Sequence, residues 1–169
     1  MSIIIRKGTV YDTESFIRFL DAIKAGMSNT EWFYLDPPDL VREMMADSTM
    51  KIWLAMDESR LAAVFSILYP GLHSYNYGYD LDLTEEELQR VIHMDTVAVH
   101  PDYRGLGLQK RMVHLAEQEL SGGGHRILLS TVHPDNQFSL DNMRYQGYVI
   151  QKRLGKYGSE RYVLRKDIF

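Results

Sequence analysis

The chain has 169 residues, with 19 lysines and arginines against 23 aspartates and glutamates, and a formal net charge of −4. This balance provides no basic field for a nucleic acid, so we expect no such partner. No apolar run is long enough to cross a bilayer, so we expect no membrane partner and a cytoplasmic location. Cysteine is absent, which excludes disulfides, thiolate metal sites and a cysteine nucleophile. The length and the 45% hydrophobic content predict a single domain over residues 1–169.

The N-terminal half of the chain predicts one strand, two helices and a hairpin. A β-branched run opens the chain, and two segments with apolar residues at helical spacing follow it. The first helix ends at Gly26, and the second begins at the Asp36-Pro37-Pro38 turn. Two apolar runs then flank a polar turn, as in a hairpin whose second strand is central. The expected elements are a strand at 3–6, helices at 12–26 and from 38, and strands at 51–56 and 61–68.

Residues 70–92 predict an insertion before the next strand. A polar-aromatic run, 73–79, precedes the capping box at 84–87 and a short helix through Leu88 and Val91. The segment also carries five acidic residues, and tyrosine rings attract cations, so we expect it to bind a positively charged ligand. Alternatively, it is a surface loop that packs on itself or on a second subunit of a homodimer. The candidate substrate-binding residues are Tyr75, Tyr77 and Tyr79.

Residues 93–120 combine a strand, a glycine-containing loop and a helix. Valines alternate in the strand, and Gly105 and Gly107 precede a segment with an apolar helical stripe. The first backbone N–H groups of such a helix have no partner, and the helix dipole adds positive charge there. The loop therefore predicts an anion site, and phosphate suits it best. Its spacing fits neither G-x-G-x-x-G nor a P-loop, because Lys110 stands three residues after Gly107.

The C-terminal part predicts three strands and one helix. The glycines at 122–124 end the long helix, and a continuously apolar strand at 127–132 follows. The next helix begins at Asn136 and ends by Gly147, before two strands that a turn at 157–160 joins. The last two strands are expected around 148–150 and 162–164. Periodicity alone thus predicts a mixed α/β domain.

The string V-A-V-x-P-x-Y-R-G-x-G-L-Q at residues 97–109 resembles the acyl-CoA signature of the GNAT superfamily of N-acyltransferases. Arg104 and Gly107 fit the signature, whereas Gln109 stands where a small residue is usual. The order of elements is also similar to the GNAT fold from Ile3 to Leu164. This resemblance implies an α/β (α+β) fold with a mixed, mostly antiparallel sheet of about seven strands. It further implies helices on both faces and a V-shaped splay between the fourth and fifth strands.

The resemblance implies acetyl-CoA as the cofactor. The backbone of Val97 would face the acyl carbonyl, that of Val99 would pair with the pantetheine arm, and the loop N–H groups would hold the pyrophosphate. Asn136 matches an asparagine that contacts the arm in many relatives, and Ser139 lies one turn further along; an asparagine there is alternatively a helix cap. The candidate cofactor-binding residues are Val97, Ala98, Val99, Arg104, Gly105, Leu106, Gly107, Leu108, Gln109, Lys110, Asn136 and Ser139.

Asp95 and His93 are the candidate catalytic residues. Both lie on the strand of Val97 and Val99, and a period of two would place all four side chains on one side. Relatives often place an acidic residue or a histidine here, as the base that receives the proton of the amine. A histidine suits this role because its ordinary pKa is about 6.5. The structural alternative is a hydrogen-bonded carboxylate at a bulge and a histidine at a strand entrance.

Many relatives carry a tyrosine as general acid seven residues after the asparagine, but this chain has Met143 there. Tyr145 lies roughly 200° away around the helix and cannot easily replace it. We nevertheless expect an acetyl-CoA-dependent N-acetyltransferase that transfers acetyl to a primary amine of a small molecule, by direct attack on the thioester. The alternatives are a non-catalytic acyl-CoA-binding or sensor domain and a peptide or protein N-acetyltransferase. No histidine spacing predicts a metal site.

Overall fold

The computed structural model describes all residues 1–169, and the chain divides into two compact units. The first unit consists of Met1–Leu68 and Asp95–Ala116, and the second of Tyr69–Met94 and Glu117–Phe169. The single domain over residues 1–169 therefore stays a prediction. No helix combines the length and the apolar character that crossing a membrane requires.

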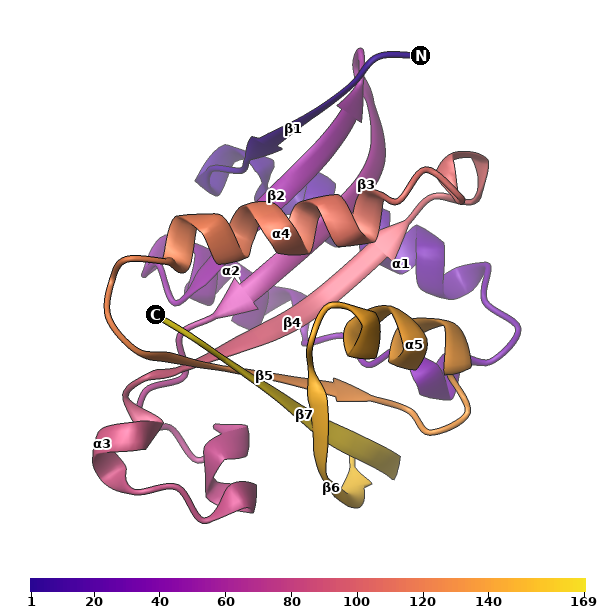
Figure 1. The fold of residues 1–169 in the computed structure, drawn as a ribbon. Helices are drawn as coiled ribbons and strands as arrows, with labels where there is room; N and C mark the ends of the chain where they lie inside the picture. The colour runs from indigo at the N-terminus through magenta and orange to yellow at the C-terminus, as the bar shows by residue number, and fades with distance from the viewer. The chain divides into compact units, whose positions relative to one another are not determined.

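The first unit follows the predicted order of strands and helices. Its elements are β1 (Ile3–Lys7), α1 (Thr13–Ala25), α2 (Pro38–Ala46), β2 (Met50–Asp57), β3 (Arg60–Leu68), the second half of β4 (Val91–Val99) and most of α4 (Leu108–Leu120). Figure 1 shows α1 and α2 on one side of β2 and β3, and α4 on the other. The predicted helix boundaries are confirmed at Gly26, which caps the C-terminus of α1, and at Pro38, which opens α2.

The core of the first unit lies between the helices and the strands. Apolar side chains at helical spacing on α1, such as Phe16 and Leu20, meet Val41 of α2. Ile52 and Leu54 alternate along β2 and face the same cluster. Both strand residues are at most 1% exposed, so this face of the sheet is closed to water.

The second unit contains the insertion and the C-terminal strands. Its elements are the 3₁₀ turn Tyr77–Leu81, α3 (Glu85–Leu88), the first part of β4, the end of α4, β5 (Arg126–Val132), α5 (Gln137–Tyr145), β6 (Val149–Lys156) and β7 (Ser159–Ile168). The predicted capping box is confirmed, because the Thr84 hydroxyl accepts the Glu87 N–H at 3.2 Å and Glu87 accepts the Thr84 N–H at 2.9 Å. The predicted extension of this helix to Val91 is wrong, since Val91 already belongs to β4.

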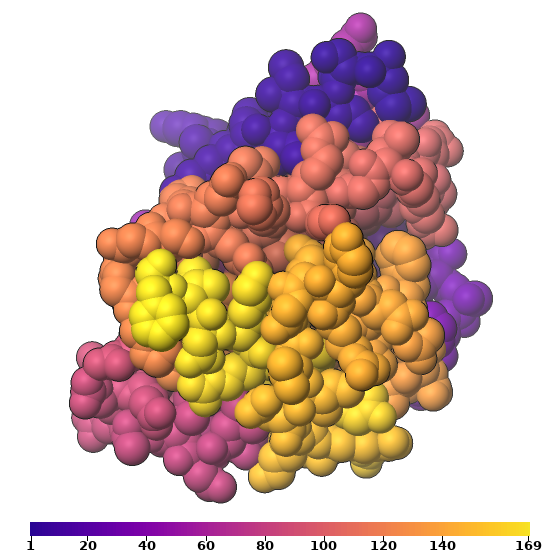
Figure 2. Space-filling view, in the orientation of Figure 1, coloured from indigo at the N-terminus to yellow at the C-terminus, as the bar shows by residue number.

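Seven strands are hydrogen-bonded in the order β1-β2-β3-β4-β5-β7-β6. β4 and β5 are parallel, whereas the pairs β1–β2, β2–β3, β5–β7 and β6–β7 are antiparallel. The atoms of β6 and β7, gold and yellow, lie side by side on the face seen in Figure 2. β4 pairs with β5 from Val91 to His93, and the predicted divergence would begin beyond these residues. The predicted mixed, mostly antiparallel sheet is thus confirmed.

Gly8 is the point of closest approach between the end of β1 and the core. A Cβ atom on Gly8 would lie 2.4 Å from Cγ1 of Ile52, whose side chain is fully buried. We expect Gly8→Ala to lower the free energy of unfolding by about 1–3 kcal/mol, because Ile52 must move within a filled core. Urea denaturation measures this change. Gly155→Ala on β6 is the control, since its Cβ would meet nothing within 4 Å, and an equal loss in both variants would contradict the explanation.

Candidate active site

The glycine loop after β4 is anchored to the turn between β2 and β3. Tyr103 is buried, and its hydroxyl donates to Oδ2 of Asp57 at 2.8 Å. Arg60, in the same turn region, binds the Asp102 carboxylate at 2.7 Å and lies over the Tyr103 ring. The backbone N–H of His100 donates to Ala62 of β3 at 2.8 Å. These contacts fix the position at which the chain leaves the strand and enters the loop.

The loop itself exposes backbone donors. Gly105 and Gly107 have φ angles of +80° and +68°, in the left-handed region, and a Cβ atom on either would meet nothing within 4 Å. Glycine is therefore required here for its backbone angle and not for space. α4 begins at Leu108, and the N–H of Arg111 donates to Gly107 at 3.0 Å. The N–H groups of the three preceding residues have no intrahelical acceptor, as in an anion site at a helix N-terminus.

Gln109 stands where the acyl-CoA signature usually has a small residue, and its side chain packs inside the protein. Its side chain is only 8% exposed, and its Nε2 has no hydrogen-bond acceptor. A buried amide donor without an acceptor is uncommon in a folded protein. The Gln109 amide is therefore closed to solvent, and the donors that an incoming anion would meet are the backbone N–H groups of the loop. Such backbone donors at a helix N-terminus fit an anionic group such as a pyrophosphate.

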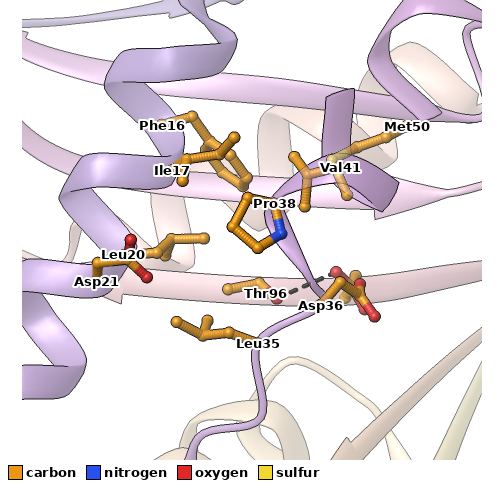
Figure 3. A pocket seen from close by; sticks show the side chains of 11 residues that line it. Phe16, Ile17, Leu20, Asp21, Leu35, Asp36, Pro38, Val41, Met50 and Thr96 are labelled. Carbon is orange, nitrogen blue, oxygen red and sulfur yellow. Dashed lines mark hydrogen bonds between the residues drawn. The ribbon is translucent and has the colours of Figure 1, made fainter. Parts of the chain in front are cut away.

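Asp95 lies in a pocket of the first unit, and one of its carboxylate oxygens is free of hydrogen bonds. The Ser66 and Thr96 hydroxyls donate to Oδ2, at 3.1 and 3.0 Å, and Oδ1 accepts none. Figure 3 shows Thr96 and Asp36 close together beside the apolar side chains of α1. Burial and the nearby Asp36 carboxylate raise the pKa of Asp95 to about 7. The Asp95 carboxylate can therefore gain and lose a proton near neutral pH.

The surroundings of Asp95 involve its neighbours on β4. Asp95 and Thr96 are neighbours in sequence, yet both line the same pocket. Ala98 then packs into the core cluster that α1 and α2 cover. The expectation that Asp95 shares a side with Val97 and Val99 stays a prediction. Asp95 lies beside Ser66, whose hydroxyl also accepts the Thr96 N–H at 3.3 Å.

His93 lies in the second unit and is almost fully buried. Its ring stacks on that of Tyr77, with centroids 3.9 Å apart, and its Nε2 accepts the Tyr77 backbone N–H at 3.1 Å. Burial and the nearby Lys156 ammonium lower the pKa of His93 to about 3. The ring is therefore neutral, and its Nε2 lone pair is occupied. Catalysis by His93 stays a prediction, and these contacts favour a structural role.

Of the three tyrosines in the insertion, Tyr77 is buried and the other two are partly exposed. The Tyr77 hydroxyl is hydrogen-bonded to that of Tyr157, and the Lys156 ammonium lies 5.3 Å from its ring centroid. Its ring thus already contacts a histidine and a lysine of the protein. Tyr75 and Tyr79 are 39% and 46% exposed, so their surfaces are accessible to a ligand. Substrate binding by these residues stays a prediction.

α5 carries the predicted contacts to the cofactor arm. The Oδ1 of Asn136 accepts the Ser139 N–H at 3.3 Å, so Asn136 caps the helix, and its Nδ2 remains available as a donor. Met143 is buried on the inner face, whereas Tyr145 is 77% exposed, as the helical angle predicts. Tyr148 donates to Glu117 at 2.7 Å, and burial with this carboxylate raises the pKa of its hydroxyl. Tyr148 is therefore unsuited to serve as a general acid.

Asp36, Ser66 and Thr96 are site residues that the sequence reasoning did not single out. Asp36 reads as part of a helix-start turn because Pro37 and Pro38 follow it. Ser66 offers the one usable signal, a hydroxyl in an otherwise apolar central strand at 61–68. A fully buried serine needs a hydrogen-bond partner, and here that partner is Asp95.

The raised pKa of Asp95 predicts how stability depends on pH. Asp95 binds a proton on folding between its ordinary pKa of 3.8 and about 7, so the folded state loses stability as the pH rises through that range. Asp95→Asn keeps an acceptor for the Ser66 and Thr96 hydroxyls but removes the charge. We expect this variant to have the higher melting temperature at pH 8, with a difference that shrinks toward pH 4. Calorimetric melts at both pH values test this, and a pH-independent difference would contradict it.

Comparison with known proteins agrees with this geometry. The family model described as the acetyltransferase (GNAT) family matches residues 22–148. The acetyltransferase of GNAT family from Streptococcus pneumoniae is 16% identical, with a TM-score of 0.75 over 99% of this chain and 100% of that one. Arabidopsis thaliana NAA60, solved with acetyl-CoA, is 15% identical, with a TM-score of 0.75 over 99% of each chain.

An N-acetyltransferase from Staphylococcus aureus Mu50 is also similar, at 11% identity and a TM-score of 0.71, over 99% of this chain and 98% of that one. No curated protein matches the chain. At these identities the solved structures support the fold, and the family model carries the assignment. Because that model spans well over half of the chain, the chain belongs to the acetyltransferase (GNAT) family and is an acyltransferase, as its sequence predicts.

Proposed function

We propose that this chain is an acetyl-CoA-dependent N-acetyltransferase that acetylates a primary amine of a small molecule. The observation that carries the proposal is the Asp95 carboxylate, which has one free oxygen in a pocket and a pKa raised to about 7 by burial and Asp36. The same strand leads into a loop whose donors suit a pyrophosphate. Acyl transfer to an amine requires a group that accepts the proton of the amine and a site that holds the acyl donor. This segment would provide both.

Acetyl-CoA, when bound, supplies the acyl thioester. The backbone N–H groups from Gly105 to Gln109 would hold its pyrophosphate, where the helix dipole favours negative charge, whereas the Arg104 N–H already donates to Pro101 at 3.3 Å. The backbones of Val97 and Val99 would align the acyl and pantetheine portions. Asn136 can cap α5 through Oδ1 and still donate to the cofactor arm through Nδ2, so both roles considered for it are compatible.

Asp95 would receive the proton of the incoming ammonium at Oδ1. An alkylammonium has a pKa of about 10.4 and no lone pair, so it must lose a proton before it can attack the thioester. A base works best when its pKa lies near the operating pH, and burial with Asp36 places that of Asp95 at about 7. The Nε2 of His93 already accepts a backbone N–H, so we assign proton uptake to Asp95 alone.

The leaving thiolate does not require a tyrosine. A thiol has an ordinary pKa of about 8.5, so its anion is a tolerable leaving group at neutral pH. Met143 occupies the position of the tyrosine found in many relatives, and the Tyr148 hydroxyl is bonded to Glu117. We therefore propose protonation of the thiolate by solvent. The homodimer and the cytoplasmic location stay predictions.

The loop assignment predicts a selective loss of cofactor binding. In Gly107→Asp, the added carboxylate would face the phosphates, and aspartate tolerates the left-handed backbone better than most residues. We expect CoA affinity, measured by calorimetry, to fall at least about tenfold, as for a like charge in a binding site. Gly122→Asp, at the other end of α4 and also at positive φ, is the control. Equal CoA affinity in the two variants would exclude this loop as the cofactor site.

The base assignment predicts a pH-dependent loss of turnover. Asp95→Asn removes the proton acceptor, so we expect kcat at pH 7 to fall by about 10²–10⁴ with CoA affinity retained. The loss should shrink at alkaline pH, where the amine deprotonates in solution. Free-thiol release from acetyl-CoA with a panel of amines measures this. An unchanged kcat would show that Asp95 is not the base, and that the pocket contributes to the rate only by aligning the reactants.

The same panel separates the alternatives. CoA binding without thiol release by any amine or peptide would support a non-catalytic acyl-CoA-binding domain. Turnover of peptide N-termini with no turnover of free amines would support a peptide N-acetyltransferase.

A further inference from the structure

We propose that a groove between α1 and the β2–β3 hairpin binds a small monocarboxylate with an apolar carbon body, and that Arg18 recognises its carboxylate. The groove shares no residue with the pocket beside Asp95 or with the glycine loop. It lies in the first unit, because every residue that lines it falls between Arg6 and Leu61. Binding at this groove does not depend on the proposed function.

The floor of the groove is the edge of the apolar core. Phe19 of α1, Met56 of β2 and Leu61 of β3 are only partly buried, and they pack against the core cluster of the first unit. Met56 and Leu61 are partners across the hairpin, at the point where its register shifts. β2 is closed to water as far as Leu54, which is 1% exposed, and the cover ends beyond that residue.

The end of this sheet face is open to solvent. Ile4 of β1 pairs with Met56, so the two side chains point to the same face, and Ile4 is 66% exposed. The groove has a volume of about 480 Å³, which lies in the range of pockets that hold small ligands. Apolar side chains that water reaches are stabilised when a hydrocarbon body takes the place of that water.

The wall of the groove carries one cation without an acidic partner. Arg18 of α1 donates to the Ser15 hydroxyl at 3.5 Å and forms no ion pair. The charge of Glu14 acts on Arg18 from one turn away, but the Glu14 carboxylate is bound by Arg42 at 2.6 and 3.2 Å. The Arg18 guanidinium therefore keeps most of its donors for a ligand.

The acidic residue of the groove is already neutralised. Asp12 accepts two hydrogen bonds from Arg6, at 2.8 and 2.9 Å, and the Thr9 N–H at 2.8 Å. The Arg6 hydrogen bonds lower the pKa of Asp12 to about 2, so this carboxylate stays ionised and paired at neutral pH. Two arginines against one aspartate leave the groove with a net charge of +1, which comes from Arg18.

A small monocarboxylate matches both parts of the groove. Its carboxylate can bind the Arg18 guanidinium through two parallel hydrogen bonds, the geometry that arginine favours. The Ser15 hydroxyl accepts from Arg18 and keeps its own O–H to donate to the same carboxylate. The carbon body can then cover Met56 and Leu61. An ammonium would face a like charge instead, and a second carboxylate would lose its water against the apolar floor.

The test titrates the full chain with octanoate and follows the Met56 methyl group by NMR of methyl-labelled methionine. Octanoate should shift the Met56 resonance and leave that of Met112 unchanged, since Met112 is fully buried in α4 of the same unit. From hexanoate to octanoate, affinity should rise about fourfold for each methylene that the floor covers. n-Octylamine, with the opposite charge, should bind at least about tenfold more weakly. An unshifted Met56 resonance, or equal affinities for octanoate and octylamine, would overturn the proposal.

The role of Arg18 is tested with Arg18→Gln, against Lys24→Gln as the control. Lys24 carries the same charge on the same helix and does not line the groove, so both variants lose one positive charge from α1. Arg18→Gln should weaken octanoate binding about fivefold, the upper end of what an exposed ion pair contributes, and Lys24→Gln should leave it unchanged. Arg18→Lys, which keeps the charge, should retain part of the affinity. Equal octanoate affinities in the two glutamine variants would overturn the assignment of Arg18.

A second copy of the chain in the groove would give a different result. The Met56 resonance would then shift with protein concentration in the absence of any ligand. Such a shift, without a further change when octanoate is added, would overturn the assignment of a small-molecule site. A resonance that is independent of protein concentration and responds to octanoate would support it.

Discussion

The chemistry proposed for this protein depends on one carboxylate that is partly buried and has no cation beside it. Asp95 receives two hydroxyl hydrogen bonds on one oxygen, which hold its side chain in place without neutralising its charge. An arginine or lysine in the same place would lower the pKa of Asp95 and make the group a permanent anion. Because the only charged neighbours are acidic, the pKa rises to about 7 instead. The same arrangement that destabilises the fold at neutral pH would suit Asp95 to the proposed role of base.

The same physical effect acts in the opposite direction two residues earlier. Burial disfavours the charged form of any group, so it raises the pKa of Asp95 and lowers that of His93 to about 3. His93 then serves as an acceptor for the Tyr77 backbone and a stacking surface for its ring. The insertion around Tyr77 is held further by Lys156, which binds the Asp80 carboxylate at 2.8 Å. β4 thus carries a histidine that is neutral and an aspartate whose pKa lies near 7.

Much of the fold could be predicted because local pattern determines it. Helical spacing, glycine stops and proline starts placed α1, α2, α4 and α5, and the alternation along 51–56 placed β2. The hydrogen-bond partner of Asp95 could not be predicted, since Ser66 stands 29 residues earlier in the sequence, on another strand. Asp36 was missed for a related reason. Its importance comes from packing against a strand 59 residues later in the sequence, and its local context indicates only a helix start.

The glycine loop shows why a short motif can persist while one of its positions changes. The backbone around Gly105 and Gly107 and the start of α4 provide the donors, and none of these depends on the side chain at 109. Tyr103 and Asp102 fix the loop, because they bind Asp57 and Arg60 at the β2–β3 turn. A larger residue at 109 therefore need not displace the loop. Gln109 is instead taken into the interior, where its Nε2 lacks an acceptor. A buried donor without an acceptor costs free energy, so Gln109 lowers the stability of the fold somewhat, while the donors that an anion would meet remain those of the backbone.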